Sequence, residues 1–421
     1  MTKARLNAVS WLLLTLLILV SASTAHGQTN AITITFWNGF TASDGEVLRE
    51  IVNRYNATNT ENIQIRMDIM PWDVMLQRLP PAIATNTGPD LILIGPESVP
   101  QYVANGALLP LDEIWEATSL EKSDFAPSVL EMFYYNGRLY QLPMQYNLLY
   151  LYWNKEHYRS AGLNPDSPPE TWTELGEYAV RLTNVRQSLF GFGMPVSTAP
   201  QWWTSVIWGN GGEFFDLETK TALLNTRTNL DSLEFLRQLA VERQVSPRGA
   251  TGPQLDNLMI GGRLGMYVNG PWLINGLKGN GVDFGIDGPP RGTVRRQVIL
   301  GGVGFAVTAS ASPQAKQAAM KFIEYWNSPE VGKEWTLRNG FPPYLLEVIA
   351  DPEIRTDPIQ AAIAPLADIG RTWTLGYESG PLLDNDALWP MFEAVLTGAR
   401  EPAEALRQAH ETIQRILDGS L

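Results

Sequence analysis

The sequence of 421 residues contains no cysteine and only three histidines. Without cysteine the chain has no disulfide, no thiolate nucleophile and no cysteine-based zinc site, and we expect no lipid anchor on an N-terminal cysteine. The histidines, His26, His157 and His410, lie far apart and lack the spacing of metal ligands, and the carboxylates form no EF-hand loop. We therefore expect neither a metal site nor a cofactor.

Positive charge is also scarce, because 31 Lys and Arg residues stand against 44 Asp and Glu residues and give a formal net charge of −13. This acidic balance argues against nucleic acid or an anionic membrane as the main partner, since both require basic patches. The apolar content of 44% and the absence of low-complexity tracts indicate a globular chain. Its length exceeds what one compact core usually holds, so we expect two domains or lobes.

A long apolar run occurs only at the N-terminus. A short basic segment precedes the apolar residues from Trp11 to Val20, and small and polar residues follow them. The run is too short to span a bilayer comfortably, so we interpret residues 1–27 as a secretory signal peptide, cleaved after Ala25 or Gly27. The alternative is a retained N-terminal anchor. We expect a mature protein that is soluble in the periplasm or another extracytoplasmic space.

The first part of the chain alternates between strand-like and helical patterns. Residues 32–37, 63–70 and 88–95 are rich in β-formers, and an apolar helical stripe lies between the first two stretches. A strand, a helix and a strand within about 40 residues form a βαβ unit, which predicts a parallel sheet. A helix that starts at Trp72 should be kinked or split by the proline pair at 80–81.

A second block of the same kind begins near residues 147–155. One helix is predicted after the capping box of Thr171 and Glu174, another after Ser312, and the last helix of the chain ends at a glycine. Residues 298–307, which precede the helix after Ser312, have the pattern of a strand. Alternating strands and helices in two blocks predict an α/β fold with two lobes, and no internal repeat is visible.

Signatures of catalysis are missing from the sequence. It has no G-x-S-x-G elbow, and its glycine-rich stretches match neither a Walker A motif nor a dinucleotide-binding fingerprint. Glycoside hydrolysis needs two opposed carboxylates, for which Glu97, Glu213 and Asp216 are candidates. A secreted glycosidase therefore stays an alternative, although a surface carboxylate is seldom catalytic.

Tryptophan, by contrast, is abundant, with 14 residues. Trp272 directly follows an Asn-Gly-Pro turn, where so large a ring is hard to bury. Sugar rings have apolar C–H faces and polar hydroxyl edges, so a site for them combines flat aromatic side chains with carboxylates, amides and Arg. We interpret the tryptophans of the second half as part of a carbohydrate site, while core packing stays the alternative for any one of them. They are Trp202, Trp203, Trp208, Trp272, Trp373 and Trp389.

An ordered set of stretches resembles the solute-binding proteins of ABC importers, in the branch that binds maltose, trehalose and related oligosaccharides or glycerophosphodiesters. The resemblance covers the mature chain nearly end to end. The stretches are ITFWNGFTASDG, GPDLILIG, YVANGALLPLD, NGRLYQLPM, LLYLYWNKEHYRSAGLNPDSPPETW, WGNGGEFFD, GMYVNGPW and GGVGFAVTASASPQAKQAAMKFIEYWNSPE. Each stretch is weak alone, but their order and spacing match the family.

The resemblance implies the two-lobed periplasmic-binding-protein fold of maltose-binding proteins, with three crossovers and a ligand cleft between the lobes. The N-terminal lobe would take residues 28–145 and 305–342, and the C-terminal lobe residues 148–300 and 346–421. The crossovers would fall near Tyr146–Asn147, Gly301–Gly304 and Pro342–Leu346. Closure of the lobes would trap the ligand, and the membrane permease would recognise the closed form.

The resemblance also implies which residues face the ligand. Glu97 matches an acid that accepts sugar hydroxyls, and Trp272 matches the main stacking tryptophan. Gln145 stands where many relatives carry Asp, so the ligand can differ from the better-known sugars. The complete set is Asn38, Thr41, Glu97, Gln145, Tyr146, Trp208, Asn210, Trp272, Gly302, Arg371, Trp373 and Trp389.

We therefore expect a monomeric, non-enzymatic receptor that captures a di- or oligosaccharide and delivers it to the permease subunits of an ABC transporter. The runner-up is a binding protein for a glycerophosphodiester or sn-glycerol 3-phosphate, in which Arg371 would bind the phosphate.

Overall fold

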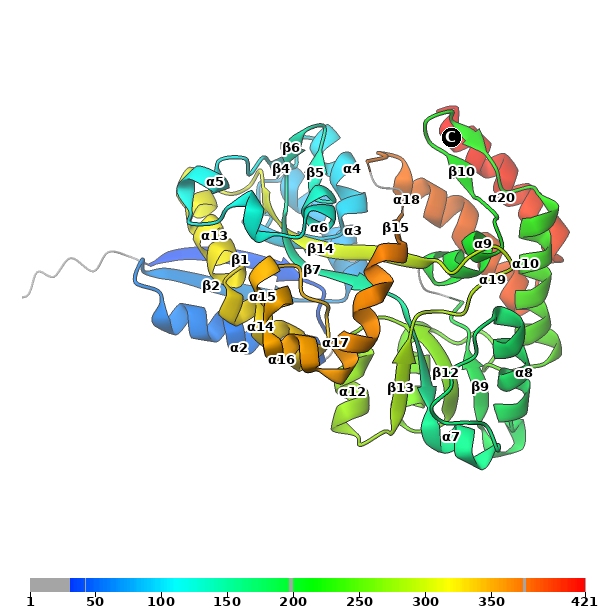
Figure 1. Ribbon diagram of the computed structural model, residues 1–421. Coiled ribbons are helices and arrows are strands. Elements are labelled where there is room, and N and C mark those ends of the chain that lie inside the picture. Colours follow the sequence, from blue (N-terminus) through cyan, green and yellow to red (C-terminus); the bar gives the residue numbers. More distant parts are fainter. Residues whose placement is uncertain (1–30, 42, 197–199, 374–375, 421) are drawn as a thin grey trace, which may run out of the picture.

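The computed structural model describes residues 31–41, 43–196, 200–373 and 376–420, which form two lobes that lie side by side (Figure 1). The predicted signal peptide, residues 1–27 with its cleavage after Ala25 or Gly27, lies outside these residues. Within the described ranges, no helix is both long enough and apolar enough to cross a membrane.

The first lobe is built on a mixed sheet in which β1 lies between β2 and β3, and β14 pairs with four other strands. Its strands run in the order β15 (Gly370–Thr372), β14 (Val298–Thr308), β3 (Leu91–Ile94), β1 (Ile32–Asn38) and β2 (Ile63–Ile69), and β4 (Leu108–Leu109) and β7 (Leu142–Leu148) also pair with β14. β1 is parallel to β2 and β3, as the βαβ pattern predicts, whereas β14 is antiparallel to β3. The predicted strands near 32–37, 63–70 and 88–95 are confirmed.

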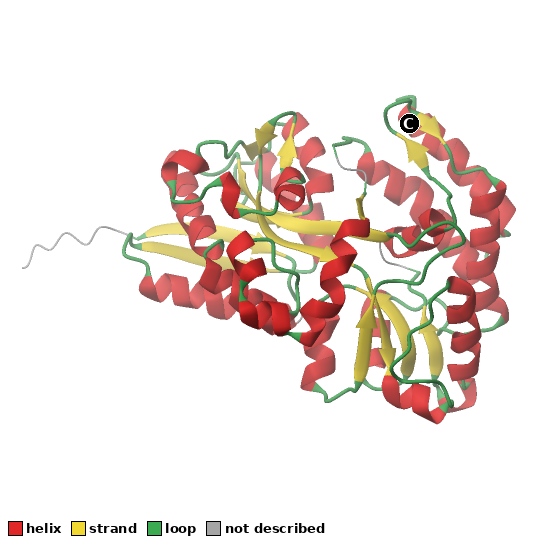
Figure 2. Ribbon diagram, in the orientation of Figure 1, coloured by secondary structure: helices red, strands yellow, loops and turns green. Residues whose placement is uncertain are grey.

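Side chains of this sheet alternate between two buried faces. Phe36 packs on the face covered by α2 (Ser43–Thr58) and α13 (Pro313–Trp326), and its neighbour Trp37 packs on the face covered by α3 (Trp72–Ala84) and α4 (Val99–Ala104). Burying a side chain of this size stabilises the fold by about 1.5–3 kcal/mol. Figure 2 shows the resulting arrangement of helices on both sides of the strands. β3, LILI, is buried throughout and is a continuous apolar run, whereas the edge strand β2, IQIRMDI, begins by alternating between buried and exposed residues.

The proline pair at 80–81 does not split its helix, so that part of the prediction is wrong. α3 is one helix that contains both prolines. Met75 and Leu79 are fully buried against the sheet, and this packing outweighs the loss of the backbone hydrogen bonds that the prolines cannot donate. Pro80 itself is exposed.

The second lobe has a four-stranded sheet in the order β13 (Phe284–Asp287), β8 (Tyr150–Asn154), β12 (Leu264–Asn269) and β9 (Phe190–Gly193). Tyr152 on one face of this sheet packs toward α11 (Gly252–Ile260) and α12 (Leu273–Gly279), while Trp153 lies on the opposite face. That opposite face is covered by α8 (Trp172–Leu182), α9 (Thr204–Gly209), α10 (Arg227–Arg237), α19 (Trp389–Thr397) and α20 (Pro402–Leu417). The predicted caps form: Thr171 accepts from the N–H of Glu174, and Ser312 from that of Ala315.

The chain passes between the two sheets at several points. β7 belongs to the first sheet and β8 to the second, with only Leu149 between them. The segment 288–297 returns from β13 to β14. A further passage, at 340–345, joins α14 (Pro329–Asn339), which packs on α2, to α15 (Leu346–Ala350), which is followed by α16 (Pro352–Thr356) and α17 (Pro358–Ile363). α17 packs against β13, and Asn147 and Leu148, just before the passage to β8, pair with Gly301 and Leu300 of β14.

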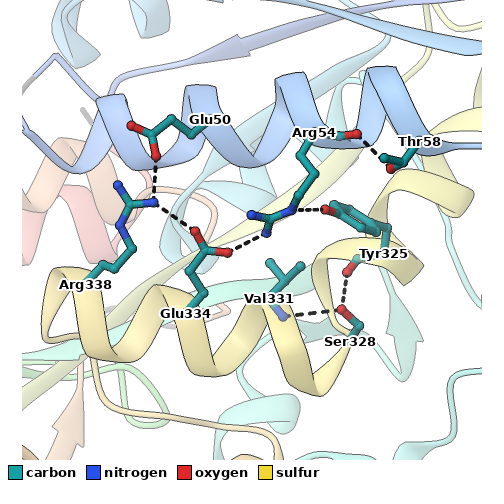
Figure 3. Close-up of polar contacts among 8 residues, drawn as sticks. All are labelled: Glu50, Arg54, Thr58, Tyr325, Ser328, Val331, Glu334 and Arg338. Atoms are coloured by element: carbon teal, nitrogen blue, oxygen red, sulfur yellow. Dashed lines mark hydrogen bonds and ion pairs between the residues drawn. The ribbon is translucent and has the colours of Figure 1, made fainter.

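An ion-pair network joins α2 to α14, as Figure 3 shows. Glu334 forms ion pairs with Arg54 and Arg338, and Arg338 also pairs with Glu50 at 2.7 Å. Arg54 donates a second hydrogen bond to the hydroxyl of Tyr325 at 2.9 Å. These contacts fix two helices that are more than 270 residues apart in the sequence.

Replacing Glu334 by Gln should lower the free energy of unfolding by about 1 kcal/mol at neutral pH. Burial alone would raise the pKa of Glu334, but hydrogen bonds from Arg54 and Arg338 outweigh it and leave the pKa lowered. A carboxyl with a lowered pKa stabilises the fold above its unfolded pKa, and this contribution is lost as the pH falls through the folded pKa.

Urea denaturation of the wild type and Glu334→Gln across acidic to neutral pH checks this. The two curves should converge in acid. Glu177→Gln, an exposed helical position, is the control and should match the wild type throughout. If the free energy of unfolding of Glu334→Gln stayed below that of the wild type by the same amount in acid, the ion-pair account would be contradicted.

Candidate functional site

A cavity of about 200 Å³ lies between the lobes and takes its walls from both. The first lobe contributes the turn after β3, the second lobe contributes the turn after β12, and strand β14 forms the floor. The lining residues are Pro96, Glu97, Met132, Asn147, Leu149, Trp202, Trp272, Ile299, Leu300, Gly301, Gly302, Thr372 and Trp373. The arrangement is a small, mainly apolar pocket with a few convergent polar groups, as expected of a binding site.

Two turns of the same sequence type place the main side chains of this cavity. Gly95-Pro96-Glu97 follows β3, and Gly270-Pro271-Trp272 follows β12. In each turn the side chain of the third residue folds back over the glycine. A Cβ atom at Gly95 would lie 2.0 Å from Oε1 of Glu97, and one at Gly270 would lie 2.1 Å from Cζ3 of Trp272. A larger residue at either position would displace the side chain of Glu97 or Trp272, so glycine allows one turn from each lobe to present its side chain to the cavity.

Tryptophan rings form the apolar walls. The ring centroids of Trp202 and Trp272 are 6.2 Å apart and the rings are tilted by 53°. Trp373 is held edge-on against Phe214, with centroids 5.1 Å apart, and its Nε1 donates to Oδ1 of Asp384 at 2.8 Å. Trp272 is half-buried rather than enclosed in the core, so part of its surface is free for a ligand.

Several polar groups of the cavity lack partners among the described residues. The side chains of Asn147 and Thr372 form no hydrogen bond there, and the indole N–H of Trp202 is buried without an acceptor. The carboxylate of Glu97 is bonded only to its own backbone N–H. Buried polar groups are normally paired, so these groups are available to a ligand that supplies hydroxyls or other polar atoms.

Burial perturbs the two carboxyls of this region. It raises the pKa of Glu97 to about 7, against which its backbone hydrogen bond acts only weakly. Burial also raises the pKa of Asp384 to about 7; the hydrogen bond from Trp373 opposes this rise, and the charge of Glu97 adds to it. Glu97 belongs to the first lobe and Asp384 to the second, so the two carboxyls influence each other across the interface between the lobes.

A second cavity of about 460 Å³ adjoins the first and shares Thr372 and Trp373 with it. Glu213 and Arg371 lie in its wall and form a bidentate ion pair, with both N–O distances at 2.8 Å. The guanidinium of Arg371 also lies over the ring of Trp208, 4.3 Å from its centroid. Arg371 is therefore already paired and stacked within the protein.

The structure brings half of the twelve predicted site residues to these two cavities. Glu97, Trp272, Gly302 and Trp373 line the first cavity, and Trp208, Arg371 and again Trp373 line the second. The other six, Asn38, Thr41, Gln145, Tyr146, Asn210 and Trp389, line neither. Thr41 is exposed, while Asn38 and Tyr146 are buried.

Internal partners account for the positions of three of these residues. Oε1 of Gln145 accepts from the indole N–H of Trp335 at 3.0 Å, and Oδ1 of Asn210 accepts from the backbone N–H of Thr293 at the same distance. Nε1 of Trp389 donates to the carbonyl of Val196 at 3.1 Å. Their polar atoms stabilise the protein's own packing.

Sequence reasoning did not assign Asn147 and Thr372 to the site, and it named Asn147 only as part of a crossover. Trp202 was among the tryptophans interpreted as part of a carbohydrate site, but not among the residues implied by the family resemblance. The repeated Gly-Pro-x turn after a strand is the signal that could have located the cavity, because it occurs at both Glu97 and Trp272.

The histidines have structural roles in the described part of the chain. A ring nitrogen of His157 is 2.7 Å from the carbonyl of Gly262, and His410 accepts from the backbone N–H of Asn225. Within the described residues, no group of three or more His, Asp or Glu side chains could hold a metal ion. His26 lies outside the described residues.

Two α/β lobes that share a solute-sized cavity are the architecture of receptors that enclose a small molecule. The family model for bacterial extracellular solute-binding proteins matches residues 50–362, and the chain belongs to this family. The fold class and the family resemblance that the sequence suggested are thereby confirmed.

Individual relatives agree with this assignment. A maltotriose-binding protein from Pyrococcus abyssi is 27% identical over 331 residues, which cover 77% of this chain and 69% of the relative. An ABC-transporter solute-binding protein from Thermotoga lettingae, solved with α-D-tagatose, has a TM-score of 0.84 and 24% identity and covers 92% of this chain and 100% of its own. UgpB from Mycobacterium tuberculosis, solved with glycerophosphocholine, has a TM-score of 0.83 and 20% identity and covers 93% and 99%. At these identities the two structures establish the shared fold.

Replacing Glu97 by Gln should raise the melting temperature at about pH 8 by about 2–4 °C. The folded protein holds the Glu97 proton to a higher pH than the unfolded chain does, so its stability falls as the pH rises from about 4.5 to about 7. Gln keeps the shape of the side chain and removes the cost of ionising it in a half-buried place.

Melting curves at about pH 4 and about pH 8 test this expectation. The two proteins should melt together at the lower pH, where Glu97 is protonated in both the folded and, increasingly, the unfolded chain. Glu116→Gln, at an exposed position of the same lobe, is the control. A Glu97→Gln protein that is no more stable than the wild type at about pH 8 would show that the carboxylate is well solvated or paired.

Proposed function

We propose that the protein is the extracytoplasmic solute-binding component of an ABC importer, and that it captures a sugar between its lobes and delivers it to the membrane permease. One observation supports this most strongly: Glu97 and Trp272, on equivalent turns of opposite lobes, meet at one cavity that also holds unpartnered amide, hydroxyl and indole groups. The name of the Pyrococcus abyssi relative, a maltotriose-binding protein, points to the same ligand class.

The chemistry of the cavity suits a sugar ring. The half-buried face of Trp272 can lie against the C–H face of a pyranose or furanose, and the carboxylate of Glu97 can accept two hydroxyls. Asn147 and the N–H of Trp202 can pair with further hydroxyls. A cavity of about 200 Å³ is smaller than the range of about 300–1,000 Å³ typical of drug-sized ligands, so it suits about one ring. Further rings of a di- or oligosaccharide would extend into the adjoining cavity of about 460 Å³.

Delivery requires that the lobes move as bodies. We assign residues 28–145 with 305–342 to one lobe and 148–300 with 346–421 to the other, with hinges near Tyr146–Asn147, Gly301–Gly304 and Pro342–Leu346. Leu149 and the segment 340–345, where the chain passes between the lobes, lie near the first and third of these positions, whereas Gly301–Gly304 lies within β14, after the passage at 288–297. Contacts such as that between the hydroxyl of Tyr135 and Glu378, at 3.2 Å, join the lobes across the interface. Closure would present a surface to the permease that the open form lacks.

The remaining assignments follow from the same scheme. We propose that residues 1–27 are a signal peptide, removed after Ala25 or Gly27, and that the mature protein acts as a monomer. We also propose that it is not an enzyme. Of the candidate glycosidase acids, Glu213 is paired with Arg371, and Asp216 accepts from the backbone N–H groups of its own turn. These contacts engage both oxygens of Glu213 and one oxygen of Asp216, which argues against a catalytic role for either.

The glycerophosphodiester alternative has less support. Arg371, its intended phosphate ligand, is already bound to Glu213, and none of the residues that line the cavity of Glu97 and Trp272 is cationic. Glycerophosphocholine nevertheless belongs in the first ligand screen, because the fold is shared with a protein solved with it.

A thermal-shift screen of the mature protein against maltose, maltotriose, trehalose, sucrose, tagatose and glycerophosphocholine tests the proposal. A ligand that binds only the folded state raises the melting temperature once its concentration passes Kd. A shift with a sugar is the expected result. A shift with the phosphodiester alone, or turnover of an aryl glycoside, would replace the proposed function.

Replacing Trp272 by Ala should weaken binding of the sugar found in that screen by about tenfold or more, because the stacking face is lost. Isothermal titration calorimetry measures this change. The matched control is Trp115→Ala, a half-buried tryptophan that packs edge-on against Phe125 in the first lobe. Wild-type affinity in a folded Trp272→Ala protein would remove Trp272 from the site.

A further inference from the structure

The cavity between the lobes has an unbalanced charge. Among the described residues, it is lined by one carboxylate, that of Glu97, by three indole rings and by no lysine, arginine or histidine. A half-buried carboxylate usually has a cationic partner or several hydrogen-bond donors, because removing its charge from water is costly. Glu97 has only its own backbone N–H.

A second carboxylate increases this imbalance from the opposite lobe. Asp384 accepts from the indole N–H of Trp373, whose ring is part of the cavity wall. Its partner is a neutral donor, and no ion pair to Asp384 exists within the described part of the chain. The charge of Glu97 acts on Asp384 across the interface between the lobes. When both carboxyls are ionised and the cavity is empty, their like charges disfavour closure.

The two arginines near the adjoining cavity do not neutralise the charge of Glu97 and Asp384. Arg371 is bound to both oxygens of Glu213 and stacked on Trp208. Arg295 is bonded to the carbonyl of Trp208 and to Glu213 as well. Both guanidinium groups are therefore held away from Glu97 by partners of their own.

We propose that the captured solute carries a cationic nitrogen as well as hydroxyls, as an amino sugar does. This inference rests on the proposed function and narrows its ligand class. The ammonium group would lie between the carboxylate of Glu97 and the rings of Trp272, Trp202 and Trp373, while the hydroxyls pair with the free amide and indole groups. A cation near two carboxylates of opposite lobes also neutralises the repulsion that opposes closure, so charge recognition and closure are coupled.

The indole rings contribute to the same preference. The face of a tryptophan ring carries partial negative charge and attracts cations, more strongly where water is excluded. Sugar C–H faces also pack on indoles, so aromatic walls alone do not separate a neutral sugar from a charged one. The carboxylate of Glu97, which has no cationic partner, distinguishes the two. A neutral hydroxyl can donate a hydrogen bond to it but cannot neutralise its charge.

Three monosaccharides that differ at one position provide the test: glucosamine, glucose and N-acetylglucosamine. Their binding is measured by calorimetry on the mature protein at a pH where the amine is protonated. We expect glucosamine to bind about tenfold tighter than the two neutral sugars. Choline and its neutral isostere 3,3-dimethylbutan-1-ol form a second pair, which reports on a quaternary ammonium solute instead of an amino sugar.

Two variants separate the charge of the site from its shape. Glu97→Gln should abolish the preference for the amine, and Asp384→Asn should reduce it, while both stay folded. Asp386→Asn removes the same charge from an exposed position two residues further along the same helical turn, and should leave the preference unchanged. Loss of the preference in all three variants would reflect only the overall charge of the protein and would overturn the assignment to Glu97.

The outcomes distinguish this inference from the proposed function. Neutral sugars that bind as tightly as glucosamine would overturn the inference and leave the sugar receptor standing. Choline that binds above its isostere, with no saccharide bound, would support the cationic site and overturn the sugar assignment. If none of these probes binds and the wider sugar screen is also flat, both are overturned.

Discussion

The antiparallel pairing of β7 with β14 is the constraint on which the arrangement of the lobes depends. β14 is 11 residues long; its end at Gly304–Thr308 pairs with β3 and β4 inside the first lobe, and its start at Val298–Leu300 pairs with β15 beside the cavity. A Cβ atom at Gly302 would lie 2.7 Å from the carbonyl oxygen of Gln145 on β7. Glycine there allows the two strands to meet and leaves their front open as the cavity floor. Gly302 thus shapes the site through its lack of a side chain.

The same strand pair has a second, apolar cavity behind it. This space of about 520 Å³ is lined by Tyr146 and Leu300 from the strands and by the prolines of the passage at 342–343. Strands bounded by space on both sides can change their mutual angle without displacing a packed core, because packed interiors resist deformation whereas unfilled volume does not. The proposed hinge therefore combines a hydrogen-bonded ladder with room to bend.

The cavity between the lobes is maintained at the expense of stability. Among the described residues, the side chains of Asn147 and Thr372 and the N–H of Trp202 have no protein partner, Glu97 has only its own backbone N–H, and burial of Glu97 opposes its ionisation. Groups of this kind would be better paired or replaced by apolar ones if stability alone were selected. A solute that forms hydrogen bonds with these groups contributes free energy that the empty protein lacks. In the proposed mechanism this free energy favours both binding and closure.

Local sequence patterns predicted the elements well and the site only in part. β1, β2 and the caps at Thr171 and Ser312 follow from periodicity and cap chemistry, which act over a few residues. Trp272 was found because its turn leaves the ring without local cover. The resemblance implies Gln145 and Trp389 as ligand contacts, and their internal partners, Trp335 and Val196, lie 190 and 193 residues away, where no local pattern reveals them. Asn147 and Thr372 became site residues only through strand pairing, which no local pattern encodes. α3 is a further case: proline inside a helix usually interrupts it, but tertiary packing of Met75 and Leu79 keeps this helix continuous through Pro80 and Pro81.

The central claim is that solute binds between the lobes and closes them, and an inter-lobe distance tests it most directly. Because the chain has no cysteine, Ala104→Cys on α4 and Glu218→Cys beside β10 (Phe215–Asp216) would give two unique labelling sites on opposite lobes (Figure 1). Both positions are exposed. Pulsed electron spin resonance between labels at these sites would be recorded with and without the solute that stabilises the protein. The account predicts a broader distribution centred at longer distance without solute, and a narrow, shorter one with it. Tight binding with an unchanged distance distribution would contradict capture by lobe closure.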